Sequence, residues 1–275
     1  MNISASDVKN LRDLTGAGMM DCKKALTESG GDIEKAIEFL RKRGQKMADK
    51  RAGRDATEGA VIAIVSDDHK RGVIVKLSCE TDFVAKNDDF VKLATSFANL
   101  ALDKFPADLD SLLALDFGGL TVGEKVMEQV GVIGEKLEIA AYEKLSAAQV
   151  APYIHMGNRA GVLVGLSKDN GDFYDAGRDV AMQVAAMHPI AVDQDGVDKT
   201  VIEKEIEIGK DQARQEGKPE AMLEKIAVGK LNKFFKEKTL LNQQFVKDNK
   251  HTIAEFLHSK DPELTVTDFK HVTLG

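Results

Sequence analysis

An eight-residue segment occurs twice in this 275-residue chain, and the repeat constrains the fold more than any other feature. Arg71–Ser78 returns as Ala160–Ser167 with five matches in eight positions, at an offset of 161 − 72 = 89 residues. Both copies are rich in β-branched residues, which is typical of strands. Each resulting sheet needs another element to cover its apolar face. The repeat therefore predicts an α+β fold with two related subdomains, each an antiparallel sheet with a helix, packed side by side.

The segments around the two copies predict the same order of elements. The first unit is expected to contain strands at 60–65, 72–77 and 137–142 and helices at 89–104 and 122–130. The second is expected to contain strands at 150–155, 160–167 and 264–272 and helices at 175–187 and 252–258. Residues 79–88 form a polar stretch, and the apolar segment 112–120 is of ambiguous type.

Before the first strand, three short helical patterns occur within residues 4–40. Ser4 and Asp7 have the spacing of a capping box, and Asp32 has the position of an N-cap. The apolar residues of the first two patterns are Val8, Leu11 and Leu14, then Met20, Cys22, Ala25 and Leu26, and the buried stripe of the third is Ile33, Ala36, Ile37 and Leu40. We therefore predict a three-helix domain with a basic linker at 1–54, a core N-subdomain at 55–147 and a core C-subdomain at 148–275.

The basic linker, residues 41–54, carries seven basic residues and one acidic residue. Its two glycines favour the tail of a helix followed by a solvated hinge. The alternative is a ribosome- or RNA-binding patch, although no aromatic residue is interleaved for stacking on bases. The net charge of −7 also argues against a surface built for direct contact with nucleic acid.

A segment of different character, residues 197–238, is inserted in the second unit. Two helical patterns flank the turn residues Gly217-Lys218-Pro219, and basic and acidic residues are mixed along both. This favours a solvent-exposed antiparallel helical hairpin. Its narrow apolar seam suggests docking onto a partner or a second copy of the chain.

The chain lacks the sequence signatures of common catalytic and metal sites. It has no P-loop, no Rossmann fingerprint, no paired-cysteine metal site and no nucleophile elbow, and its six histidines are scattered. We therefore expect neither an enzyme nor a bound metal or cofactor. Two cysteines, no signal peptide and no apolar run of membrane-spanning length predict a soluble cytoplasmic protein without a membrane partner.

Comparison of the two repeat copies points to one loop. After its strand, the second copy has the plain polar turn 168–172, whereas the first has Phe83-Val84 between Asp82 and Lys86. Phe83 either folds back onto the core or is an exposed plug aimed at a partner. Two other features each have two interpretations. His155, at a strand end, is either a solvated turn residue or a partner contact. Met19-Met20, in a glycine-flanked loop, either belongs to the core or contacts a partner.

Three blocks together resemble bacterial translation elongation factor Ts. Leu11–Leu26 is similar to the N-terminal signature of that family, and Thr81–Asn87 to its second signature. His155, with Arg159 and Gly161–Val164, resembles a third block, and the likeness runs from about residue 4 to residue 273. The resemblance implies a ubiquitin-associated-like three-helix domain, a core of two related α+β subdomains and a protruding helical hairpin.

The resemblance also implies a function, a guanine-nucleotide exchange factor for the GTPase elongation factor Tu. Thr81, Asp82, Phe83 and Val84 match the segment that disturbs the partner's Mg²⁺ site, with Phe83 entering between partner helices. The residues that match partner contacts are Arg12, Met19, Met20, Lys23, Ile133, Gly134 and His155. Some members continue into a C-terminal module that contacts the partner; this sequence ends at Gly275, so we expect that contact to be missing. A ubiquitin-type adaptor acting through the helical domain alone would leave most of the chain without a role.

Overall fold

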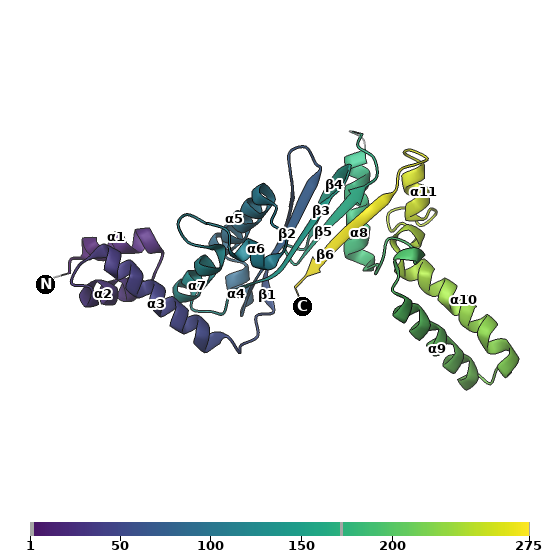
Figure 1. The fold of residues 1–275 in the computed structure, drawn as a ribbon, viewed down its shortest axis with the longest axis horizontal. Coiled ribbons are helices and arrows are strands. Elements are labelled where there is room, and N and C mark those ends of the chain that lie inside the picture. The colour runs from purple at the N-terminus through teal and green to yellow at the C-terminus, as the bar shows by residue number, and fades with distance from the viewer. Residues whose placement is uncertain (1–2, 171–172, 275) are drawn as a thin grey trace.

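The computed structural model describes residues 3–170 and 173–274, and it has the predicted α+β architecture. Three helices lie at one end, two small antiparallel sheets form the centre, and a helical hairpin projects at the other end (Figure 1). The first sheet has the order β1 (Glu58–Val65), β2 (Arg71–Cys79), β3 (Glu138–Ser146). The second has the order β4 (Gln149–His155), β5 (Ala160–Leu166), β6 (Val266–Thr273).

The sequence repeat is also a repeat of structure. The two copies are β2 and β5, and each is the central strand of its sheet. The strand pairing slips between Lys76 and Leu77 in the first sheet and between Gly165 and Leu166 in the second, again 165 − 76 = 89 residues apart. Because a bulge sets the local bend and twist of a strand, its recurrence at the equivalent position confirms two related subdomains.

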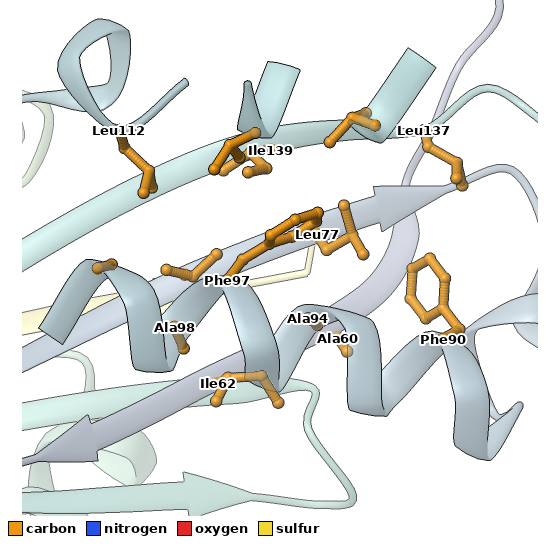
Figure 2. Packing of buried hydrophobic residues seen from close by; sticks show 14 of the residues in the cluster. Ala60, Ile62, Leu77, Phe90, Ala94, Phe97, Ala98, Leu112, Leu137 and Ile139 are labelled. Carbon is orange, nitrogen blue, oxygen red and sulfur yellow. The ribbon is translucent and has the colours of Figure 1, made fainter. Parts of the chain in front are cut away.

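The two sheets pack face to face, and one long helix covers the outer face of each. Alternate residues of β2 point to opposite sides: Val73 and Val75 join the core of the first subdomain, whereas Ile74 packs between the sheets. Figure 2 shows Phe97 of α5 (Asp88–Lys104) lying against Leu77 in the first core. In the second subdomain α8 (Phe173–Met187) has the same role. The core therefore has four layers, helix–sheet–sheet–helix.

The repeated glycine explains how closely the sheets approach. A Cβ added to Gly161 would lie 2.9 Å from Val61 Cγ1 and 3.2 Å from the Cβ of Ala63. At the equivalent Gly72, it would lie 2.8 Å from Leu163 Cδ2. Each copy thus keeps the residue that leaves room for the opposite sheet.

The N-terminal helices are α1 (Ala5–Thr15), α2 (Met19–Glu28) and α3 (Ile33–Arg51). The predicted capping box at Ser4 and the Asp32 cap are both formed. Two of the apolar pattern residues do not join the core, since Leu14 is 61% exposed and Met20 is 76% exposed. Both lie next to the tight Gly16–Gly18 connection, which turns their side chains away from the bundle. Met19 and Met20 begin α2 and do not lie in a loop.

Helix α3 is longer than its apolar pattern predicts because its second half has a packing partner. It continues through the basic segment and crosses α7 (Val122–Ile133) where Gly44 meets Gly131. A Cβ on Gly131 would lie only 2.8 Å from the Gly44 Cα. Most of the segment predicted as a hinge is therefore helix packed on the core.

The remaining elements complete the two subdomains. The polar stretch 79–88 is not simply a loop, since it contains α4 (Asp82–Ala85), and the ambiguous segment begins within α6 (Leu109–Leu113). The hairpin consists of α9 (Lys199–Gln215) and α10 (Glu220–Lys238), and Ala227 lies against Gly209. The short helix η1 (Gln194–Gly196) lies between α8 and the hairpin, and η2 (Leu240–Asn242) and α11 (Ile253–His258) lie between the hairpin and β6. Across the described ranges, no helix has the length and apolar character needed to cross a bilayer.

Candidate partner-binding site

Phe83, on the one-turn helix α4, is the most exposed large apolar residue in the described part of the chain, at 83%. Val84 and Ala85, the next two residues, pack against the core of the first subdomain. Successive helical residues point about 100° apart, so burying Val84 turns Phe83 outward. The alternative in which Phe83 folds back onto the core is therefore wrong.

A carboxylate from another part of the chain fixes the start of α4. Glu135 accepts hydrogen bonds from the backbone N–H groups of Glu80 and Thr81, both at 3.0 Å, and from the Thr81 hydroxyl at 2.6 Å. The Thr81 oxygen also accepts from the Val84 N–H at 3.4 Å, which makes it the N-cap. One side chain thus binds the backbone and the cap of the helix that carries Phe83.

A second carboxylate, Glu80, is only 15% exposed and holds the same loop from the other side. Its oxygens accept from the Lys136 N–H at 2.6 Å, from Arg51 Nη1 at 2.6 Å and from Arg54 Nη1 at 3.0 Å. The Lys136 N–H, followed by the two guanidinium groups, lowers the pKa of Glu80 from its ordinary value of 4.5 to about 2. Glu80 is therefore ionised at neutral pH.

Asp82 is the acidic residue beside Phe83. Its carboxylate pairs with Lys86 one turn later, at 2.6 Å, and the hydrogen bond from Lys86 lowers the Asp82 pKa. Both side chains reach solvent, so this pair is weak and easily exchanged for a partner's groups.

The turn after His155 lies across a groove from Asp82. That groove is lined by Asp82 and Lys86 on one side and by Met156 and Arg159 on the other. The Val61 N–H donates to the Asn158 carbonyl at 2.8 Å, which joins this turn to the first sheet. The fold thus brings residues of both subdomains to one surface.

His155 itself is half-buried at the end of β4, with its Nδ1 3.1 Å from the Tyr153 hydroxyl. The next residue, Met156, has a left-handed φ of 47° and is 72% exposed. This backbone conformation is uncommon for a non-glycine residue, and here it turns an apolar side chain into solvent beside the histidine.

The predicted N-terminal contacts also lie on the surface. Arg12, Met19, Met20 and Lys23 are all exposed. A second groove is bordered by Gly16 of this region, Val84 of α4 and Ile133 of α7, so the helical domain adjoins the Phe83 loop. Gly134 ends α7 with a φ of 82° and directs the chain to Glu135.

The residues that hold this surface in place are not predictable from the sequence pattern. Glu80, Glu135 and Arg51 are polar residues on a polar surface, and they meet only because α3, α7 and β2 converge. The position of Glu80, next to the matched Thr81 block, was the only local signal. Leu14 and Met156 were missed because their exposure depends on the adjoining turns.

Several basic residues of segment 41–54 are neutralised by acidic neighbours. Lys42 pairs with Glu38, Arg43 with Asp21, and both Arg51 and Arg54 with Glu80. Within the described residues, no group of three or more histidine, cysteine or acidic side chains is arranged to hold a metal ion.

Comparison with known proteins agrees with the three sequence blocks. The family model described as Elongation factor TS matches residues 80–275. A protein named Elongation factor Ts from Amoebophilus asiaticus is 56% identical, and the match covers 100% of both chains. Proteins of the same name from Christiangramia forsetii and Porphyromonas gingivalis are 54% and 46% identical, over at least 99% of each chain. The chain therefore belongs to the elongation factor Ts family.

Proposed function

We propose that this protein is a guanine-nucleotide exchange factor that binds the GTPase elongation factor Tu and promotes GDP release during translation elongation. The observation that carries the proposal is the outward-facing ring of Phe83 on an anchored helical turn, in a chain of this family. The partly buried Val84 and Ala85 pack on the core and leave the ring in solvent, and an exposed aromatic ring is the kind of residue that dominates binding to a partner.

Exchange needs only a difference in binding between two states of the GTPase. A GTPase that holds GDP with nanomolar affinity gains about 12 kcal/mol from that contact. An exchange factor must bind the empty state better than the GDP-bound state, and the antagonism is reciprocal. No covalent step is required, which agrees with the absence of a catalytic signature in the sequence.

In this proposal Thr81, Asp82, Phe83 and Val84 disturb the Mg²⁺ and phosphate site of the partner. Burial of the Phe83 ring is worth about 1.5–3 kcal/mol, and it becomes available only when partner elements separate to admit the ring. Asp82, a solvent-accessible carboxylate, adds negative charge beside the region from which the cation leaves.

The other matched residues supply the affinity that keeps the Phe83 ring in place on the partner. The exposed methionines Met19 and Met20 offer an adaptable apolar contact, and Arg12 and Lys23 offer charges beside it. Ile133 lines the groove beside Val84 and is followed by Gly134, and His155 precedes Met156, which lines the groove beside Asp82. Docking or dimerisation through hairpin 197–238 remains a prediction, which gel filtration of the complex tests.

The direct test is the rate of release of a fluorescent GDP analogue from purified elongation factor Tu, with and without this protein. We expect acceleration at millimolar Mg²⁺, and a smaller factor when Mg²⁺ has already been removed by a chelator. Release that is unchanged by the protein would contradict the proposal.

The ion pairs of segment 41–54 favour this function over a ribosome- or RNA-associated module, because four of its seven basic residues are already paired with acidic side chains of the chain. The dependence of binding affinity on salt concentration distinguishes the two functions. Affinity for RNA falls steeply with salt concentration, whereas apolar docking weakens slowly.

A further inference from the structure

We propose that Glu80 and Glu135 are positioning residues for Phe83, and that Arg51 links the N-terminal helices to this loop through Glu80. The inference rests on the exchange function proposed above and names the contacts that make the Phe83 ring effective. We call Arg51, Glu80, Glu135 and Thr81 the loop clamp.

The need for a clamp follows from the size of α4. A helix of four residues, Asp82–Ala85, is not stable by itself. The Phe83 ring is almost fully exposed, so its own packing cannot set its direction. The direction therefore depends on the inward contact of Val84 and on the hydrogen bonds of Glu80 and Glu135 to the preceding backbone.

One continuous helix joins the clamp to the N-terminal domain. Helix α3 has 19 residues; Ala36, near its start, is buried in the N-terminal core, and Arg51, at its end, binds Glu80 at 2.6 Å. A helix of this length extends about 28 Å. Because α2 and α3 share the N-terminal core, the position of that domain is linked to Glu80 through α3.

Helix α7, which leads to Glu135, crosses α3, which ends at Arg51. Gly131 lies so close to Gly44 that even a methyl group would not fit between the backbones. Beyond the crossing, α7 ends at Gly134, and the next residue, Glu135, binds Thr81. Helix α3 thus contributes Arg51 and the end of α7 places Glu135 at the loop, and the relative position of the two helices is fixed by backbone contact.

The clamp predicts a particular kinetic effect. A pre-oriented ring loses little conformational freedom on entering a partner, whereas a loose loop must first be ordered. Anchoring residues elsewhere still provide most of the affinity. Weakening the clamp should therefore lower the maximal rate of GDP release at saturating exchange factor and leave the half-saturating concentration nearly unchanged.

The first test needs no partner: amide hydrogen exchange of residues 81–86 in the free protein. We expect Glu135→Ala to accelerate exchange about tenfold, which corresponds to loss of hydrogen bonds to a charged group. Glu135→Gln should restore most of the protection, because its amide oxygen still accepts the two N–H groups. The control is Glu263→Gln, which removes an exposed partner of Lys168 in the second subdomain. Unchanged exchange in Glu135→Ala, with the fold intact, would overturn the inference.

The second test combines Arg51→Met with Phe83→Ala in the GDP-release assay. We expect Arg51→Met alone to lower the maximal rate about three- to tenfold, the effect of weakening a charged hydrogen bond. In the Phe83→Ala background it should have no further effect, because the clamp acts through the ring. If the effects of the two substitutions multiply in the double variant, Arg51 acts elsewhere than through the ring, and the inference is overturned. If the wild type does not accelerate release at all, the exchange function fails, and hydrogen exchange still decides the clamp.

Discussion

At the scale of single residues, Phe83 and Phe97 are the same side chain in opposite surroundings. Phe97 is fully buried against the first sheet, whereas Phe83 points into solvent from α4. The two positions belong to the same subdomain, so they form a matched pair.

We predict that Phe97→Ala lowers the free energy of unfolding by about 3–5 kcal/mol, because it leaves a cavity in the core. Phe83→Ala should change it by less than about 0.5 kcal/mol, as is usual for a surface residue. Urea denaturation of both variants measures this. A large loss of stability in Phe83→Ala would mean that the ring packs on its own fold.

Glu80 gives a prediction about pH. Its pKa is lowered to about 2 in the folded state from an ordinary 4.5, so the ionised form stabilises the fold above pH 4.5. That stabilisation is lost as the pH falls from 4.5 through 2. Because the side chain is slightly exposed and the pairs are partly solvated, we expect a contribution of about 1–2 kcal/mol.

The measurement is the free energy of unfolding of the wild type and Glu80→Gln between pH 7 and pH 2.5. The difference between them should be largest at pH 7 and shrink on acidification, since protonated Glu80 resembles glutamine. A difference that is independent of pH would contradict the assignment of the Glu80 pKa.

Sequence reasoning at this scale could identify Phe83 but not its direction. The contrast between 79–87 and 168–172 singled out the ring from composition alone. Whether it faced the core depended on the rotation of α4, which Val84 and Glu135 set through tertiary contacts. Glu135 is 55 residues from Glu80, and no local pattern connects them.

At the scale of elements, the crossing of α3 and α7 determines how the N-terminal domain attaches to the core. The strands and the amphipathic helices were predictable because their periodicity is local. The second half of α3 was not, because its polar sequence is stabilised by the close approach of Gly44 and Gly131.

We therefore predict that Gly131→Ala destabilises the protein by about 1–3 kcal/mol, because the added methyl group forces the two helices apart. Gly229→Ala in α10 is the control. No atom outside its own stretch of helix backbone lies within 4 Å of the new Cβ, so the substitution should stabilise the hairpin by about 0.5–1 kcal/mol through helix propensity. Thermal unfolding of the two variants should shift in opposite directions; equal shifts would contradict a close helix crossing.

At the scale of the whole molecule, the two subdomains form one unit because their sheets share a tightly packed interface. The repeat predicted the pairing of subdomains, and the equivalent bulges in β2 and β5 show how far the duplication extends. It could not predict which faces would meet, because Gly72 and Gly161 have a packing role only when the opposite sheet is present.

The two glycines should not respond equally to substitution. At Gly161 a methyl group meets Val61 Cγ1 and also the Cβ of Ala63, which is fixed to its backbone, whereas at Gly72 it meets only the ends of side chains, the flexible end of Leu163 and Val150 Cγ1. We expect Gly161→Ala to cost about 1–3 kcal/mol and Gly72→Ala clearly less. Chemical denaturation distinguishes them; a greater loss in Gly72→Ala would show that the sheets pack differently.

The central claim is that the exposed ring of Phe83 separates partner elements that hold GDP. The most direct measurement is the maximal rate of GDP release from elongation factor Tu at saturating wild type, Phe83→Leu and Phe83→Ala, with affinity for the nucleotide-free GTPase measured separately. We predict that the rate falls stepwise with the size of the side chain, by about tenfold or more for alanine, while the fold and most of the affinity are retained. An alanine variant that releases GDP as fast as the wild type would contradict the claim.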